Sequence, residues 1–359
     1  MILGKLFHEG LISAGFKSIH IPKRILRKIE SSEALQILQW VCVYLLLNKY
    51  VLCKAKKSGK LLTFFQNLEI ITEGESERLA ELCVEKFSKC SNVMNIYELL
   101  REVPKYPMFI IDLSFWHEHT EGEKKELVEQ ILMSLKIVRS FLWDECLVIT
   151  SSNSEFEYLL SKFARNLIHK MIITKDNVST YLKKLMIKEK IVPVVLDPEA
   201  IQDLTIQDLN LYNIYILGGI VDKERVDKYG TYRLYNTLKL YELNIPRSKI
   251  SLKGSVIGVP DRINRIIEII LLAKYVLNNL EKAILTVQSR RDKYLRVIYE
   301  IQKYARKVKS NDKVIHIVNK AFLNYLVKTY NIDDKMLSRI SKSLNLEVLD
   351  NELENIFNN

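Results

Sequence analysis

The chain has 359 residues, 48% of them hydrophobic, with a formal net charge of +11 at pH 7. This length is enough for two or three domains with a sizeable core, and the positive charge favours an anionic partner. The five cysteines form no CxxC pair, and their odd number and spacing suit neither a disulfide framework nor a zinc knuckle. Composition therefore argues against a disulfide-stapled secreted domain, and we expect reduced intracellular thiols.

The positive charge is concentrated in two segments that flank the middle of the chain. Residues 1–60 contain 11 Lys and Arg against 3 Asp and Glu, and residues 286–328 show the same 11 against 3. Each segment thus has a net charge of +8, whereas the rest of the chain is mildly acidic. Randomly placed surface lysines would not segregate in this way, so both segments are candidates for contact with phosphates.

The first 104 residues are predicted to form a basic, helical domain. The longest apolar run, Leu35–Leu47, is too short to cross a bilayer and is expected to be a buried helix. Residues 61–100 become acidic with a helical period, for which Thr72 is a possible N-cap. Pro104 and Pro107 indicate a linker and a domain boundary. The chain start lacks the apolar core of a secretory signal, so we expect a cytoplasmic protein with no membrane role.

Residues 105–285 follow a different pattern, in which short apolar runs alternate with longer amphipathic stretches. This order is typical of an α/β domain with a mainly parallel sheet. Ligands of such sheets gather at the carboxyl ends of the strands, and three of those ends carry an acid: Asp112, Asp197 and Asp222. The predicted strands are 108–113, 146–151, 170–174, 192–196 and 213–217, and the clearest helices are 123–141 and 153–167.

Residues 286–359 are predicted to form a second basic, helical domain. The stretch 289–309 mixes Arg and Lys with three tyrosines, Tyr294, Tyr299 and Tyr304. A solvated helix with one buried stripe would have this composition, and so would a helix that contacts RNA phosphates; the charge excess favours the second interpretation. The segment shows no strand pattern.

Two glycine-containing loops are the clearest candidates for a ligand site. The chain contains no GxGxxG, GxxxxGK, HExxH or GxSxG motif. Instead, the strand "YILGG" ends in Gly218-Gly219, and a second small-residue loop, "SLKGSVIGVP" (251–260), follows one helix later. Two such loops at neighbouring strand ends would form a slot for a flat ligand that is recognised by backbone groups, with Asp222 facing the reacting atom.

Several of these motifs occur together in one known family. "FIIDLSF" (109–115), a helix carrying Gln130, "VVLDPEA" (194–200), "YILGGIVDK" (215–223) and the segment 251–270 follow one another in the order of the tRNA position-nine purine-N1 methyltransferases. Residues 105–285 resemble this family, which belongs to the knotted SPOUT superfamily. The flanking basic domains resemble its archaeal branch in layout.

The resemblance implies a fold, a cofactor and a set of site residues. The parallel sheet would contain a trefoil knot, one of the rare exceptions to unknotted topology. The knot would bind S-adenosylmethionine, and the chain would act as a monomer on tRNA, without a metal ion. Asp222 maps onto the family's catalytic aspartate and Gln130 onto a glutamine that contacts the base. The residues that map onto the cofactor pocket are Leu196, Gly218, Gly219, Ile220, Leu252, Ser255 and Ile257.

The chemistry of methyl transfer fits this assignment. Guanine N1 carries a proton that must leave, and a carboxylate can accept it as a general base. Adenine N1 has a free lone pair, but its methylated product is cationic, and Asp222 could stabilise that charge. Between the two bases we expect adenine to be favoured. Shape recognition of folded tRNA would use both basic segments, through Lys23, Arg24, Arg27, Lys28, Lys54, Lys56, Lys57, Arg290, Arg291 and Arg296.

Simpler interpretations of single residues remain open at the level of sequence. Asp222 could cap a helix, and Asp112 is better explained as a hydrogen-bonding residue at a strand end. Asp197-Pro198 is typical of a turn, and Gln130 would by default be exposed. The pair His117 and His119 has no nearby third ligand, so it is expected to lie on the surface or in a pocket wall rather than on zinc.

Two other functions also fit the sequence. The first is a non-catalytic RNA-binding protein on a degenerate SPOUT core, which Asp222 and the two glycines argue against. The second is a small-molecule methyltransferase, which would not need the basic segments.

Overall fold

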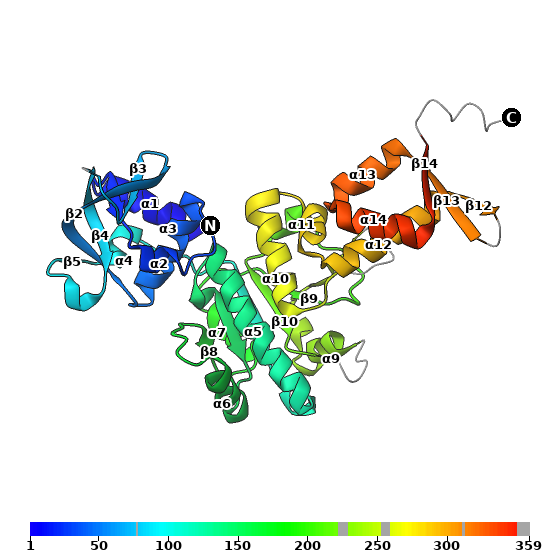
Figure 1. The fold of residues 1–359 in the computed structure, drawn as a ribbon. Coiled ribbons are helices and arrows are strands. Elements are labelled where there is room, and N and C mark those ends of the chain that lie inside the picture. The colour runs from blue at the N-terminus through cyan, green and yellow to red at the C-terminus, as the bar shows by residue number, and fades with distance from the viewer. Residues whose placement is uncertain (77, 222–228, 253–258, 311–312, 350–359) are drawn as a thin grey trace. The chain divides into compact units, whose positions relative to one another are not determined.

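The computed structural model describes residues 1–76, 78–221, 229–252, 259–310 and 313–349. The chain forms two compact units, Met1–Lys249 and Ile250–Asn359 (Figure 1). In the described part of the chain, no helix is both long enough and apolar enough to span a bilayer.

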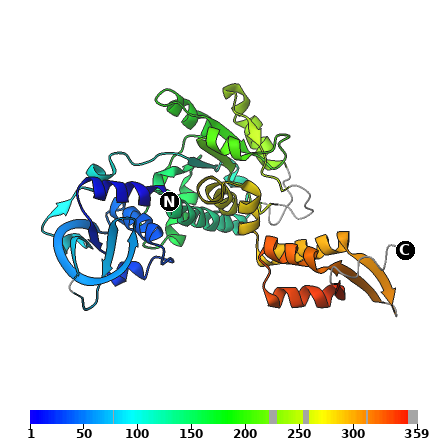
Figure 2. The same cartoon turned by 90° about the horizontal axis from the view of Figure 1, so that it is seen from above.

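The first unit begins with a small sheet and four short to medium helices. Its elements are α1 (Ile2–Ser13), β1 (Ser18–His20), α2 (Lys23–Leu26), α3 (Ala34–Leu46), β2 (Val51–Phe65), β3 (Leu68–Thr72), β4 (Arg78–Glu85), β5 (Val93–Met94) and α4 (Ile96–Leu100). β1 pairs in parallel with β3 and β4, whereas β2 pairs antiparallel with β3, β4 and β5. The strands β3, β1, β4 and β2 therefore close into a ring, in which β2 is the strongly curved strand of Figure 2.

This ring corrects the prediction that the N-terminal segment is helical. The buried helix expected at Leu35–Leu47 is confirmed as α3. Residues 61–100, however, contain the end of β2 and the strands β3, β4 and β5, and Thr72 ends a strand instead of capping a helix. In β4, Ala80 and Leu82 are buried while Glu81 is exposed, which is the period of two expected for a strand. The charged residues of the same stretch also recur at helical spacing, so the sequence pattern was ambiguous.

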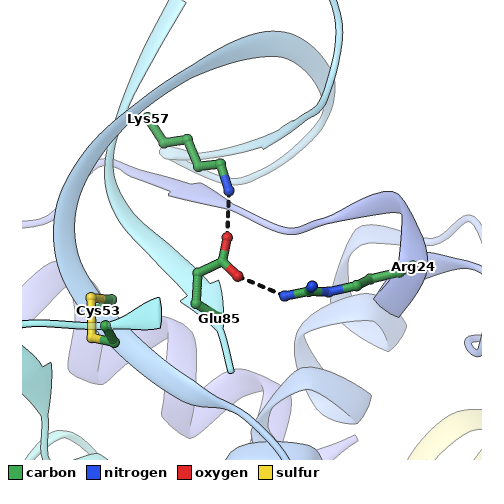
Figure 3. Close-up of a disulfide and its surroundings, with 5 residues drawn as sticks. Arg24, Cys53, Lys57 and Glu85 are labelled. Carbon is green, nitrogen blue, oxygen red and sulfur yellow. Dashed lines mark hydrogen bonds and ion pairs between the residues drawn. A yellow bond between two sulfur atoms is a disulfide. The ribbon is translucent and has the colours of Figure 1, made fainter. Parts of the chain in front are cut away.

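The prediction of reduced thiols is also corrected. Cys53 on β2 and Cys90 form a disulfide across 37 residues (Figure 3), while Cys42, Cys83 and Cys146 are free and buried. The strand register explains the proximity, because Cys53 pairs with Val93 on β5, three residues beyond Cys90. The sequence spacing alone could not reveal this long-range pairing.

The second part of the first unit is a six-stranded sheet with helices. Its elements are β6 (Met108–Asp112), the short 3₁₀ helix η2 (Trp116–Glu118), α5 (Glu121–Phe141), β7 (Leu147–Thr150), α6 (Ser154–Phe163), β8 (Ile172–Ile173), α7 (Val178–Met186), β9 (Pro193–Leu196), α8 (Ile206–Leu211), β10 (Ile214–Gly218), α9 (Gly230–Thr237) and β11 (Arg247–Ser248). The strand order is β11-β9-β10-β6-β7-β8, and every neighbouring pair is parallel. The predicted α/β domain with a mainly parallel sheet is confirmed.

Apolar runs and a helix cap explain why this part folds as it does. All five residues of β6 are buried, as expected for a central parallel strand covered on both faces. Ile110, Val148 and Ile216 from three neighbouring strands belong to one core cluster. α5 begins at a capping box, in which the Thr120 side chain accepts from the Glu123 amide and the Glu123 carboxylate accepts from the Thr120 amide.

A buried glutamine connects the two parts of the first unit. Gln39 on α3 is fully buried, and its Oε1 accepts from the amide of Gly4 at 3.0 Å. Its Nε2 donates to the carbonyls of Arg139 and Leu142, at the end of α5, at 2.9 and 2.6 Å. Because every polar atom of this amide is used, α1, α3 and α5 are joined by one satisfied buried group.

The second unit contains both helices and strands. Its elements are α10 (Ile263–Leu272), the π-helical segment η5 (Ala273–Leu277), α11 (Leu280–Val287), α12 (Arg290–Tyr304), β12 (Arg306–Ser310), β13 (Lys313–Asn319), α13 (Lys320–Tyr330), α14 (Asp334–Leu344) and β14 (Leu346–Leu349). β13 lies between β12, which is antiparallel to it, and β14, which is parallel. The prediction of a purely helical C-terminal domain is therefore wrong. The strands β12, β13 and β14 are short and lie next to predicted helices. Their sequences are too short to show a clear alternation of apolar and polar residues.

Candidate active site

The carboxyl end of β6 is held by a buried carboxylate. Asp112, the last residue of β6, is fully buried, and its Oδ1 accepts from the amide of Ser114 at 2.9 Å. Its Oδ2 accepts from the Thr150 hydroxyl at 2.7 Å, the Ser151 hydroxyl at 3.0 Å and the Val178 amide at 3.1 Å. Four donors balance the cost of burying the charge, and they fix the ends of β6 and β7 and the start of α7. The predicted hydrogen-bonding role of Asp112 is confirmed.

The glycine pair lies beside this carboxylate. Gly218 is the last residue of β10 and pairs in register with Asp112 on β6. The amide of Gly219 then donates to the carbonyl of Asp112 at 2.8 Å. A Cβ at position 219 would lie 2.7 Å from that carbonyl oxygen, so only glycine allows the backbone to come this close. A Cβ at position 218 would instead meet the tip of Ile220, at 2.9 Å.

The loop after β6 contacts the chain on both sides of the segment 222–228. His119 is 5% exposed, and its Nε2 accepts from the amide of Val221 at 3.0 Å. Glu118 forms a bidentate ion pair with Arg233 on α9, at 3.0 and 2.7 Å. The Arg233 guanidinium also lies over the ring of Phe115, 4.3 Å from its centroid. Of the predicted environments for His119, an exposed surface is wrong, and the pocket wall remains a prediction.

Sequence reasoning did not find the roles of Glu118 and Arg233. The two residues are 115 positions apart, and each alone is an ordinary surface charge. The only available signal was the HxH pattern, which directed attention to metal binding. Among the described residues, no group of three or more His, Cys, Asp or Glu could hold a metal ion.

The end of β9 forms a turn, as predicted. Asp197 follows the strand and is 1% exposed, and its Oδ1 accepts from the amide of Glu199 at 3.0 Å. Its Oδ2 accepts from Arg247 at 2.6 Å, and the guanidinium of Arg247 lies over the rings of Tyr232 and Tyr235. The turn joins the ends of β9 and β11 to α9.

Gln130 lies on α5 and differs from its expected environment. The side chain is 7% exposed, whereas a default helix glutamine would face solvent. Its side-chain Nε2 donates to the Glu126 carboxylate at 3.3 Å, and the backbone carbonyl of Gln130 accepts from the Ser134 hydroxyl at 2.7 Å. The contact with a base remains a prediction.

The remaining predicted site residues lie in three places: outside the described residues, in the second unit and in the first unit. Asp222, Ser255 and Ile257 lie outside the described residues. Leu252 is buried and belongs to the second unit, while Leu196 and Ile220 belong to the first. The structure brings Gly218 and Gly219 together with Asp112.

The strand ends fit the cofactor that the sequence implies. Gly218 and Ile220 are partly exposed at the carboxyl edge of the sheet, and Leu196 ends the neighbouring strand β9. The Gly219 amide already donates to the Asp112 carbonyl, whereas Gly218 and Ile220 offer a glycine backbone and a partly exposed apolar side chain. Such an edge, the cradle, suits a flat, partly apolar ligand.

The predicted RNA-contacting residues lie in very different environments. Lys23, Arg27 and Lys28 are exposed near α2, and Lys54 and Lys56 are exposed on β2. Arg24 and Lys57 both pair with the carboxylate of Glu85 (Figure 3), which neutralises part of their charge.

Among the C-terminal candidates, Arg296 is a correction. It is 4% exposed, and its Nε donates to the Tyr330 hydroxyl at 2.8 Å, so it belongs to the core of the second unit. Arg290 and Arg291 are exposed at the start of α12. Of the three arginines, Arg296 lies on the face of α12 that packs against the core. A count of charges does not distinguish this face from the exposed one.

The fold and the strand ends define an α/β protein with a parallel sheet whose carboxyl edge carries the glycine pair and Asp112. The model of the family tRNA (guanine(9)-N(1))-methyltransferase TRM10/TRM10A matches residues 75–292, and the chain belongs to this family. The resemblance found from the motifs is confirmed.

Two curated relatives and one solved structure are similar over most of the chain. The tRNA (adenine(9)-N1)-methyltransferase of Sulfolobus acidocaldarius is 32% identical over 327 residues, which cover 89% of this chain and 98% of the relative. The tRNA (guanine(9)-/adenine(9)-N1)-methyltransferase of Thermococcus kodakarensis is 28% identical and covers 97% of this chain and 90% of the relative. The crystal structure of Sulfolobus acidocaldarius Trm10 in complex with S-adenosylhomocysteine gives a TM-score of 0.68 at 26% identity, covering 95% of this chain and 99% of that chain.

Proposed function

We propose that this protein transfers a methyl group from S-adenosylmethionine to N1 of the purine at position 9 of tRNA, with adenine favoured over guanine. The observation that carries the proposal is the similarity to the adenine-N1 methyltransferase over 89% of the chain. The relative that is named for both bases is slightly less similar, at 28% against 32% identity, which supports the preference for adenine.

The proposed fold is a SPOUT domain whose parallel sheet contains a trefoil knot. Support comes from the likeness to Sulfolobus acidocaldarius Trm10, bound there to S-adenosylhomocysteine. We assign residues 105–285 to this domain, with an N-terminal domain before it and a C-terminal domain after it. The protein is proposed to act as a monomer in the cytoplasm.

The proposed cofactor site is the cradle at the carboxyl ends of β9 and β10. Leu196, Gly218, Gly219 and Ile220 would form one wall with their backbone groups and apolar surface. The family pattern adds Leu252, Ser255 and Ile257 to the proposed cofactor-binding residues. When bound, S-adenosylmethionine would supply an electrophilic methyl group on its sulfonium.

Catalysis by the protein's own residues rests on position and charge. Asp222 would accept the N1 proton of guanine, or stabilise the cationic ring of methylated adenine. Gln130 would orient the base through its amide. The contacts of His119 with Val221 and of Glu118 with Arg233 would hold both ends of the segment that carries Asp222, because they tie its flanks to the loop after β6.

The role of Asp222 is tested by replacing its carboxylate with an amide. Asp222→Asn should reduce methylation of a guanine-9 substrate about 10²–10⁴-fold, since no base remains to remove the proton. The loss on an adenine-9 substrate should be smaller, because no proton need leave N1 beforehand. Single-turnover rates on the two substrates provide the measurement, with Glu281→Gln on the exposed face of α11 as the control. Equal losses on both substrates would argue against a general base.

The proposed function itself is tested with two unmodified tRNA transcripts that differ only in A or G at position 9. Labelled S-adenosylmethionine and nucleoside analysis of the product should give mainly 1-methyladenosine, with less or no 1-methylguanosine. If neither transcript is methylated although tRNA binds, the chain is a non-catalytic RNA-binding protein. Binding of the cofactor without tRNA would instead indicate a small-molecule substrate.

A further inference from the structure

The second unit contains a groove that is lined by positive charge. Its cavity has a volume of about 910 Å³ and lies against the helices α12 and α14. Five of its eight lining residues are cationic and none is acidic. The lining residues are Arg290, Arg291, Tyr294, Lys335, Met336, Arg339, Lys342 and Ser343.

Helical spacing explains why the cations gather here. Lys335, Arg339 and Lys342 are four and three residues apart, so they form one stripe along α14. The opposite stripe of α14, with Ile340 and Leu344, is buried in the core. Over seven residues the cationic stripe extends about 10 Å along the helix axis, which is a length comparable with a few successive phosphates.

The second wall comes from a helix about forty residues earlier. Arg290, Arg291 and Tyr294 lie at the start of α12, and both arginines are exposed. Arg290 forms an ion pair with Asp333, whose other oxygen accepts from the Met336 amide at 2.8 Å and caps α14. No ion pair with a carboxylate is found for Arg291, Lys335, Arg339 or Lys342 among the described residues, so their charge is available to a ligand.

We propose that this groove binds the phosphate backbone of the tRNA substrate. The inference rests on the proposed function for the identity of the RNA, and it adds α14 as a phosphate-binding element that the sequence analysis did not include. Four of the five cations have no ion pair with a carboxylate in the described part of the chain, which suits phosphates, and Tyr294 and Met336 offer apolar contact to sugars. An acidic protein segment and an anionic membrane are the competing ligands.

The groove is tested by removing the three cations of α14 at once. The variant carries Lys335→Gln, Arg339→Gln and Lys342→Gln. All three side chains are exposed and glutamine is a good helix former, so the fold should persist. The matched control carries Lys307→Gln, Lys309→Gln and Lys328→Gln, three exposed lysines of the same unit outside the groove. Both variants lose the same net charge.

Binding of an unmodified tRNA transcript is then measured by fluorescence anisotropy at several salt concentrations. The groove variant should bind about 10-fold or more weakly, with the slope of log K against log salt reduced by about 2–3, while the control changes much less. Methylation at saturating tRNA should keep its rate constant and show only a raised KM. Equal weakening in the two variants would overturn the proposal, because it would indicate diffuse attraction to net charge.

Two further outcomes separate this inference from the proposed function. If tRNA binding depends on the groove but no methylation occurs, the groove proposal stands and the enzymatic proposal fails. If methylation occurs with unchanged tRNA affinity and salt slope in the groove variant, the groove proposal fails alone. Loss of binding to an acidic peptide, or to vesicles containing phosphatidylserine, with tRNA binding unchanged would assign the groove to the competing ligand.

Discussion

The strand-end site and the cationic groove place their polar groups in opposite ways. Around Asp112 the charge is fully buried, and four donors fix one carboxylate. In the groove, Lys335, Arg339 and Lys342 are exposed on a helix surface. Chemistry at one atom needs fixed positions, whereas attraction of a phosphate chain needs mainly charge. We therefore expect a single isosteric substitution to cost much stability at the strand-end site around Asp112 and little in the cationic groove.

The largest effect on stability is expected for Asp112→Asn. An amide nitrogen cannot accept the hydrogen bonds that Oδ1 and Oδ2 now accept, so at least one buried donor would face another donor. We expect a loss of about 2–4 kcal/mol in the free energy of unfolding, measured by urea denaturation. The same change at the exposed Asp334 on α14 is the control and should cost less than about 0.5 kcal/mol. Similar losses of unfolding free energy for Asp112→Asn and Asp334→Asn would contradict the expected difference between the buried and the exposed carboxylate.

A smaller effect is expected when a methyl group is added at the glycine pair. Gly219→Ala places Cβ against the Asp112 carbonyl, and the backbone must shift, at a cost of about 1–3 kcal/mol. Gly218→Ala meets only the flexible tip of Ile220 and should cost less. Urea denaturation measures the free energy of unfolding, and calorimetric titration measures the affinity of the cradle for S-adenosylhomocysteine. Equal destabilisation by the two substitutions would show that the contact with Asp112 is not the reason for Gly219.

The smallest effect concerns a buried group without partners. His20 on β1 is fully buried, neither ring nitrogen has a hydrogen-bond partner among the described residues, and burial together with the charge of Lys57 lowers its pKa. Because the unfolded chain binds the proton more readily, stability should be greatest above the ordinary histidine pKa of about 6.5 and fall as the pH drops below it. His20→Phe should make this decline less steep, as measured by urea denaturation between pH 7.5 and 5.5. Parallel curves for the two proteins would contradict the prediction.

Much of the parallel sheet could be predicted because five of its six strands are short, mainly apolar runs, whereas the polar strand β11 (Arg247–Ser248) was not predicted. The segments around Ile110, Val148 and Val195 are buried on both faces, so composition alone marked them. In the N-terminal ring, by contrast, β2 carries exposed lysines between half-buried positions, and β4 carries charges at helix-like intervals. Their identity as strands depends on pairing partners far away in the chain.

The candidate site was predictable where one local motif defines it. Gly218 and Asp112 each end a predicted strand, so a parallel sheet places both at its carboxyl edge, and the structure pairs them in register. The pairing of Glu118 with Arg233, the bond from Val221 to His119 and the burial of Gln130 and Arg296 depend on tertiary packing. No spacing within the sequence encodes these contacts.

Asp333 has a consequence for the energetics of the cationic groove. Two helices that carry only positive charge along their facing sides would repel each other, yet one carboxylate both caps α14 and pairs with Arg290 on α12. The core shared by α12 and α14, which includes Ile301 and Ile340, holds the two walls in place before any ligand arrives, and the ion pair offsets part of the repulsion. The ordering of the groove is thereby completed during folding, so a bound polyanion need not supply the conformational entropy of assembling it.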